Sequence, residues 1–125
     1  MVGMSYGGFY TLFTTAIDTR IKAAVASSQY NNRFEYSWSD WTWFNAGFTF
    51  RDNEVAALVY PRPLCLEIGD KDELFKAELG QKEYERLSKI IGDANWPEFR
   101  VFEGNHEFYK GGEDLEKLVQ FLKTM

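Results

Sequence analysis

The sequence predicts an α/β protein in which a mostly parallel β-sheet is covered by helices on both faces. Short apolar segments of strand length alternate along the chain with longer segments whose apolar residues recur at helical spacing. The apolar segments read as nearly continuous hydrophobic runs, which is typical of strands buried on both faces of a parallel sheet. The chain has 125 residues, 45% of them hydrophobic and 26% charged, which is compatible with one globular domain.

The elements are predicted in the order helix, strand, helix, strand, helix, strand, helix. The first helix segment is aromatic-rich but long and free of proline, which favours a buried helix. The last two helices carry apolar residues on one face at helical spacing. These are Gly80, Tyr84, Leu87 and Ile91 in the first and Leu115, Leu118, Val119 and Leu122 in the second. The predicted elements are helix Tyr6–Ile17, strand Ile21–Ser27, short helix Asp52–Leu58, strand Pro63–Ile68, helix Lys76–Ile91, strand Phe99–Phe102 and helix Glu113–Lys123.

The most informative motif is a G-x-S-x-G near the start of the chain, formed by Gly3-Met4-Ser5-Tyr6-Gly7. This pattern is typical of a sharp turn from a strand into a helix, with the serine in a strained backbone at its apex. The flanking glycines are expected because the chain passes close on both sides, where a Cβ would clash. Ser5 is therefore the candidate nucleophile.

The position of this motif carries an expectation about domain organisation. A buried strand of about five residues should precede Ser5, yet only Met1–Met4 stand before it. We therefore expect residues 1–125 to be the C-terminal portion of a single catalytic domain whose N-terminal strands are missing. The exposed edge of the first strand would then favour pairing with another chain, including self-association.

A serine hydroxyl needs a base within hydrogen-bond reach, and His106 is the chain's only histidine. It follows the last predicted strand, on the loop Glu103-Gly104-Asn105-His106. The loop after Pro63–Ile68 offers the acid, and Asp72 is favoured. Asp70 is the alternative, although it could instead accept hydrogen bonds from backbone amides of its own turn. Glu73 could instead stabilise the first turn of the next helix.

The carboxyl ends of parallel strands meet at one edge of a sheet, so Ser5, Asp72 and His106 are predicted to converge there despite their separation in sequence. An oxyanion hole needs two donors. The backbone N–H of Tyr6, at the start of the new helix, is the predicted first donor. The second would come from a loop after an earlier strand, which this chain lacks, so strongly reduced activity is expected.

A long aromatic segment, residues 29–51, separates two of the predicted elements. Connections in such folds usually run about 2–6 residues, so this segment is predicted to be an insertion over the carboxyl edge of the sheet, where ligands bind. Trp38, Trp41 and Trp43 are candidate walls of a substrate pocket, where a sugar ring could stack. The alternative is a packed aromatic cluster that anchors the loop.

Charge and cysteine content argue against several classes of function. The net charge of −5 disfavours nucleic acid or an anionic membrane surface as a partner, and no apolar run reaches the length of a membrane span. Cys65 lies in an apolar run and reads as a buried strand residue. One cysteine and one histidine cannot form a metal cluster, so no metal is expected.

Four stretches of the chain resemble the α/β-hydrolase fold family, and particularly its acetyl-xylan-esterase and dienelactone-hydrolase-like branch. They are Val2-Gly3-Met4-Ser5-Tyr6-Gly7-Gly8, Pro61-Arg62-Pro63-Leu64, Gly69-Asp70-Lys71-Asp72-Glu73-Leu74-Phe75 and Phe102-Glu103-Gly104-Asn105-His106-Glu107-Phe108. Serine at position 5 fits the esterase side, since dienelactone hydrolases proper carry cysteine there.

The resemblance implies hydrolysis of a small-molecule or carbohydrate acyl ester through an acyl-enzyme, with no metal or organic cofactor. Two alternatives remain open at this point. Prolyl-oligopeptidase-type serine peptidases share the fold and the order of the three residues. A non-catalytic module that keeps the appearance of a hydrolase is the other alternative.

Overall fold

A computed structural model of the chain describes residues 1–35 and 45–125. Its centre is a four-stranded sheet in the order β1-β2-β3-β4, and every neighbouring pair of strands runs parallel. The strands are β1 (Val2–Met4), β2 (Ala24–Ser27), β3 (Leu64–Gly69) and β4 (Glu98–Phe102). Sequence order equals spatial order. Because all four strands run in the same direction, their carboxyl ends lie along one edge of the sheet.

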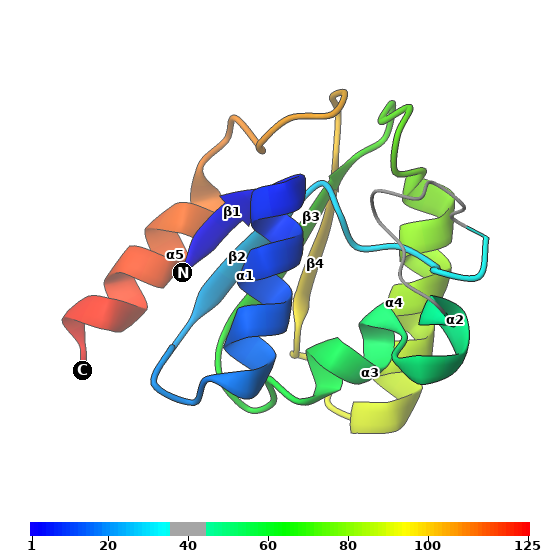
Figure 1. The fold of residues 1–125 in the computed structure, drawn as a ribbon. Helices are drawn as coiled ribbons and strands as arrows, with labels where there is room; N and C mark the ends of the chain where they lie inside the picture. The colour runs from blue at the N-terminus through cyan, green and yellow to red at the C-terminus, as the bar shows by residue number, and fades with distance from the viewer. Residues whose placement is uncertain (36–44) are drawn as a thin grey trace.

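The helices cover the two faces of the sheet (Figure 1). They are α1 (Tyr6–Ile17), α2 (Ala46–Thr49), α3 (Asp52–Ala57), α4 (Ala77–Ile91) and α5 (Glu113–Lys123). Helix α1 packs on β1 and β2, α3 packs between α1 and α4, and α5 packs on β2. The main core lies between α1, α3 and α4 and the side chains Ala24, Ala26, Leu64 and Leu66. Because side chains alternate along a strand, Cys65 points to the opposite face, toward α5.

The predicted α/β class and the parallel sheet are confirmed, and most boundaries agree within one residue. Helices α1 and α5 have the predicted limits. Strand β2 was predicted from Ile21 but begins at Ala24. Pairing with β3 starts at Ala24, opposite Leu64, and the carbonyl of Ile21 instead accepts a hydrogen bond from the Arg62 guanidinium at 2.8 Å.

Two helices are less buried than their sequences predict. Helix α1 was predicted to be buried, but only one face is covered, and Tyr10 and Ile17 are exposed. The apolar stripe of α5 is also partly open to solvent, since Val119 and Leu122 are exposed. Helix α4 does bury its predicted face through Gly80 and Leu87.

The described parts of the aromatic segment 29–51 leave the carboxyl end of β2 and run toward α3 and α4 (Figure 1). Residues 29–33 are all buried. The Asn31 side chain donates to the carbonyl of Lys76, just before α4, and Arg33 forms an ion pair with Asp52 at 3.0 Å in which neither side chain is exposed. The start of this segment is thus anchored inside the protein. No helix within residues 1–35 and 45–125 has the length and apolar character needed to cross a membrane.

Candidate active site

Ser5 occupies a tight turn between β1 and α1, as the sequence predicted. Its backbone has φ 57° and ψ −122°, a region that residues other than glycine rarely adopt. Backbone hydrogen bonds hold it there: the Ser5 N–H donates to the carbonyl of Ser27 and the Ser5 carbonyl accepts from Phe9, both at 2.9 Å. A conformation of this kind persists only where the surrounding structure fixes it, and it presents the Ser5 side chain at the edge of the sheet.

The glycines around Ser5 differ from the prediction in one respect. A Cβ at Gly3 would overlap the carbonyl of Gly7, as expected. A Cβ at Gly7, however, would meet nothing within 4 Å, so the predicted close approach at this residue is wrong. The second close approach is at Gly8, where a Cβ would lie 2.5 Å from the carbonyl oxygen of Ser27. Helix α1 therefore contacts the end of β2 through Gly8.

The His106 imidazole lies between Ser5 and Asp72, with a hydrogen bond on each side. Its Nε2 is 2.8 Å from Oγ of Ser5, and its Nδ1 is 2.9 Å from Oδ2 of Asp72. An ionised carboxylate only accepts hydrogen bonds, so Nδ1–H donates to Asp72 and Nε2 is left to accept from the Ser5 hydroxyl. This arrangement can remove a proton from Ser5 and stabilise the resulting imidazolium.

The three side chains come from loops after β1, β3 and β4, at the carboxyl edge of the sheet. Asp72 is fixed by its own loop, because its Oδ1 accepts the backbone N–H groups of Leu74 and Phe75, each at 2.8 Å. The Asp72 side chain is fully buried, whereas that of His106 is 22% exposed. The ring of Phe75 stacks on the imidazole, with centroids 5.9 Å apart. Asp72 is thus shielded from water, while the His106 imidazole stays accessible.

The two other carboxylates considered from the sequence have different positions. Oδ1 of Asp70 accepts the N–H of Gly104 at 3.0 Å. Asp70 thus joins the loop after β3 to the loop that carries His106, instead of bonding an amide of its own turn. Glu73 was a candidate for the first turn of the next helix. That interpretation is wrong, because α4 begins at Ala77 and its first-turn acid is Glu78.

The remaining predicted site residues are Tyr6 and three tryptophans. Tyr6 is the first residue of α1, so its backbone N–H is at the helix start, next to the Ser5 side chain. Trp38, Trp41 and Trp43 lie outside the described residues. Beside the imidazole is a cavity of about 370 Å³, lined by Lys71, Glu73, Leu74, Asn105 and His106.

Sequence reasoning missed a serine pair at the end of β2. Ser28 has a left-handed backbone, with φ 56°, and its hydroxyl donates to the carbonyl of Glu107 at 2.9 Å. The Ser27 hydroxyl makes a longer contact with the same carbonyl at 3.4 Å. Both serines are completely buried. Two serines at the end of a strand are too common to have indicated this contact, which spans 79 residues of sequence.

Glu67, on β3, was also not singled out from the sequence. It is 2% exposed, and burial together with a hydrogen bond to Asp114 raises the pKa of its carboxyl to about 7. Asp114, in the first turn of α5, is bound by the Arg100 guanidinium at 2.8 and 3.1 Å. Glu67 is the register partner of Ser27 on the neighbouring strand, and it is a buried carboxyl whose ionisation is disfavoured.

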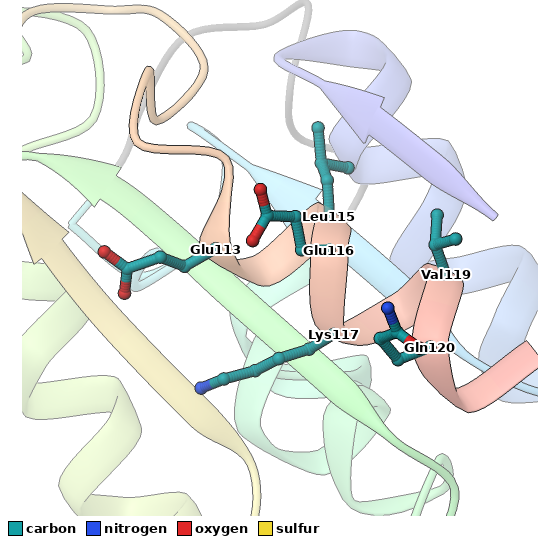
Figure 2. Close-up of a pocket in the computed structure, with 6 residues that line it drawn as sticks. All are labelled: Glu113, Leu115, Glu116, Lys117, Val119 and Gln120. Atoms are coloured by element: carbon teal, nitrogen blue, oxygen red, sulfur yellow. The ribbon is translucent and has the colours of Figure 1, made fainter.

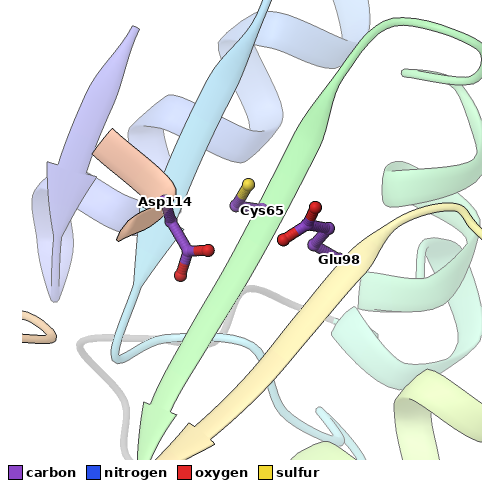
Figure 3. Close-up of side chains that lie close together, drawn as sticks. All are labelled: Cys65, Glu98 and Asp114. Atoms are coloured by element: carbon purple, nitrogen blue, oxygen red, sulfur yellow. The ribbon is translucent and has the colours of Figure 1, made fainter. Parts of the chain in front are cut away.

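Two other features of the described residues lie apart from Ser5 and His106. A cavity of about 620 Å³ lies along α5, where Figure 2 shows Leu115 and Val119 projecting from one side of the helix; its lining residues are Glu113, Leu115, Glu116, Lys117, Val119 and Gln120. On the sheet face that α5 covers, the side chains of Cys65, Glu98 and Asp114 point toward one another (Figure 3).

The acidic cluster is already neutralised by the protein's own cations. Lys117 donates to both oxygens of Glu98 at 2.8 and 2.6 Å, and Arg100 binds Asp114. Burial and the negative charge of Asp114 raise the pKa of the Cys65 thiol to about 12, so the sulfur stays protonated. A metal ion would have to displace both cations and deprotonate this thiol.

Comparison with solved structures identifies the fold. The chain has the α/β-hydrolase fold over the portion that it spans. Among similar structures are an esterase of carbohydrate esterase family 15 from a marine bacterial metagenome (16% identity, TM-score 0.70, 98% of this chain and 40% of that one) and a glucuronoyl esterase of the same family from Caldicellulosiruptor kristjansonii (19% identity, TM-score 0.69, 96% and 41%).

An esterase from Pyrococcus furiosus is also similar (22% identity, TM-score 0.63, covering 98% of this chain and 52% of that one). The chain thus spans about half or less of the length of these esterases. No protein-family model matches the sequence, and neither does any curated protein. The resemblance to the α/β-hydrolase fold predicted from the motifs is confirmed at the level of fold.

Proposed function

We propose that this chain carries the nucleophile, base and acid of a serine hydrolase that cleaves carboxylic esters. Ser5 is the nucleophile, His106 the general base and then acid, and Asp72 the residue that orients the imidazole. The observation that supports this proposal most strongly is the position of His106, 2.8 Å from Ser5 Oγ and 2.9 Å from Asp72 Oδ2. Three residues that are far apart in sequence form a continuous chain of hydrogen bonds, along which the proton moves only between Ser5 and His106.

In the acylation step, Nε2 of His106 removes the proton from the Ser5 hydroxyl as Oγ attacks the ester carbonyl carbon. A bond forms between Oγ and that carbon, and the carbonyl electron pair moves onto its oxygen. When the tetrahedral intermediate collapses, the bond to the alcohol oxygen breaks. The imidazolium returns its proton to that oxygen, so the alcohol leaves neutral and the acyl group stays on Ser5.

In the deacylation step, a water molecule takes the place of the alcohol. His106 removes one proton from the water as its oxygen attacks the acyl carbon, and the bond to Ser5 Oγ then breaks with the proton returned to Oγ. The 22% exposure of the His106 side chain supports this step, because water must reach Nε2. Asp72 stabilises the imidazolium in both steps.

We propose the backbone N–H of Tyr6 as one donor to the oxyanion. It follows the nucleophile directly and opens α1, where backbone N–H groups and the helix dipole favour negative charge. Its position is fixed by the same turn that fixes Ser5. A donor at this place would act on the oxygen that becomes charged when Ser5 Oγ attacks.

For the substrate we propose a small or carbohydrate acyl ester. Glucuronoyl esterases and other esterases are among the structurally similar proteins. The cavity beside His106 supports a polar alcohol, because Lys71, Glu73 and Asn105 offer hydrogen bonds around its rim. Trp38, Trp41 and Trp43 remain predicted pocket residues on sequence grounds alone.

The proposal is tested by turnover of matched ester and anilide substrates. We expect p-nitrophenyl acetate to be hydrolysed by the wild type, with Ser5→Ala reduced to the rate of buffer and Ser88→Ala, a serine on α4, unchanged. Preferential cleavage of a peptide anilide would favour the peptidase alternative. The proposed function would be contradicted if neither this chain nor a longer protein that includes it showed ester turnover that depends on Ser5.

We also propose that the chain can self-associate through β1. This strand pairs only with β2 in the described sheet, and Val2 on it is 40% exposed. An unpaired strand edge offers backbone donors and acceptors to an identical edge. Size-exclusion chromatography coupled to light scattering should give a mass that rises with concentration, and Val2→Pro should reduce it; a concentration-independent monomer would contradict the proposal.

A further inference from the structure

The loop that carries His106 is tied down on both sides of the imidazole. On the N-terminal side, the Gly104 N–H donates to Asp70 at 3.0 Å, and the Gly104 carbonyl accepts the Lys71 N–H at 2.9 Å. On the C-terminal side, the carbonyl of Glu107 accepts the Ser28 hydroxyl at 2.9 Å. Glu107 is the next residue after His106, so this bond acts one peptide unit away from the base.

Ser28 is itself held by the sheet. Its backbone N–H donates to the carbonyl of Glu67 on β3 at 2.8 Å, and its left-handed backbone, with φ 56°, turns the chain at the end of β2. The neighbouring residue completes the link, because the Ser27 carbonyl accepts the N–H of Ser5. The dipeptide Ser27–Ser28 therefore contacts both the nucleophile turn and the histidine loop.

We propose that Ser28 is a positioning residue for His106, which fixes the distance between the imidazole and Ser5 by holding the Glu107 carbonyl. This inference rests on the proposed function of Ser5 and His106 and adds a residue to it. The Ser28 side chain is fully buried, so it cannot touch a substrate. Its effect must pass through the loop, as a restriction on where the imidazole can lie.

Loss of the hydroxyl should free the C-terminal side of the histidine loop. Of the two serine hydroxyls, only that of Ser27 would then contact the Glu107 carbonyl, at 3.4 Å. A displacement of about 1 Å at a catalytic group can cost roughly a hundredfold in rate. We therefore expect Ser28→Ala to lower kcat by about ten- to a hundredfold with little change in KM, since the substrate contacts are untouched.

The spectroscopic test uses the fact that His106 is the only histidine in the chain. Imidazole ¹H–¹⁵N spectra of the protein therefore report this ring alone. In the wild type we expect a low-field Nδ1 proton, protected from exchange by the bond to Asp72. In Ser28→Ala this signal should broaden or vanish while the backbone amide spectrum keeps its dispersion. Ser88→Ala, the matched control on α4, should give the wild-type signal.

A second variant separates the hydroxyl from the backbone conformation. Ser28→Gly suits a φ of 56° but also lacks the hydroxyl, so it should lose the Nδ1 signal as Ser28→Ala does. Retention of the wild-type signal in either variant would overturn the role of the hydroxyl. The Nδ1 signal does not depend on turnover. Failure of the Ser28 inference therefore appears as an unchanged signal, whereas failure of the esterase proposal appears as absence of Ser5-dependent turnover.

Discussion

The Asp72 carboxylate and the His106 imidazole meet at 2.9 Å, and the carboxylate is fixed by two backbone amides on its other oxygen. The bond therefore joins a rigid, fully buried acid to a ring that is partly open to solvent. Because Asp72 accepts from Nδ1, it selects the tautomer whose Nε2 can take the proton of Ser5. The contact thus determines both the orientation and the tautomer of the His106 imidazole.

Asp72→Asn should abolish most activity without unfolding the protein. The amide can still bond the ring, but it favours the wrong tautomer and cannot stabilise the imidazolium. A fall in kcat of roughly 10⁴ is expected, as for the corresponding change in a serine protease triad. Steady-state kinetics and circular dichroism give the measurement. Asp70→Asn is the control, and an equal loss in that variant would contradict the assignment of Asp72.

The strained backbone of Ser5 should cost stability that glycine recovers. Ser5→Ala and Ser5→Gly both remove the hydroxyl, so both should be inactive. They differ only in the Cβ, which is unfavourable at φ 57°. We expect Ser5→Gly to be more stable than Ser5→Ala by about 1 kcal/mol in urea denaturation. Equal stability of the two variants would show that the turn stores no strain.

Adjacent glycines of α1 should respond in opposite ways to alanine. Gly8→Ala places a Cβ against the Ser27 carbonyl and should lower the free energy of unfolding by about 1–3 kcal/mol. Gly7→Ala meets open space and should raise it by about 0.5–1 kcal/mol through higher helix propensity. Denaturant midpoints of the two variants give the comparison, and a reversed order would contradict the close contact at Gly8.

The raised pKa of Glu67 gives stability a defined dependence on pH. Its folded pKa of about 7 is above the ordinary value of 4.5 because burial, and then Asp114, oppose its ionisation. The folded state therefore holds this proton more tightly than the unfolded state, and the stabilisation is complete below pH 4.5 and is lost as pH rises to 7.

Glu67→Gln should remove this contribution. Urea midpoints measured between pH 4.5 and 8 should fall with rising pH in the wild type, and the fall should be smaller in the variant. The variant should also be the more stable protein at pH 8, since it buries no carboxylate. Parallel pH profiles for the two proteins would contradict the buried, protonated state of Glu67.

Much of this arrangement could be predicted because it depends on local pattern and chain order. The limits of α1 and α5 follow from residues 6–17 and 113–123 themselves. Ser5, Asp72 and His106 could be chosen because each follows a strand, and parallel strands bring their carboxyl ends to one edge. The order of the loops could not separate Asp70 from Asp72, which lie in the same loop; Asp72 was favoured and Asp70 stayed the alternative until the 2.9 Å contact with His106 distinguished them.

Other features depend on contacts that the sequence does not encode locally. The close approach at Gly8 instead of Gly7 is set by how α1 lies on the end of β2. The bond from Ser28 to Glu107 joins residues of ordinary types across most of the chain. The partly exposed stripe of α5 has the same periodicity as the buried face of α4, so the two could not be distinguished from the sequence.

Covalent labelling of Ser5 by a fluorophosphonate tests the central claim most directly, because the reagent reacts much faster with a serine that a nearby base activates than with other side chains. We predict one phosphonyl adduct, mapped by mass spectrometry to the peptide that contains Ser5. It should be absent in Ser5→Ala, strongly slowed in His106→Ala and unchanged in Ser88→Ala. No adduct on the wild-type protein, or an adduct that persists in Ser5→Ala, would contradict the account.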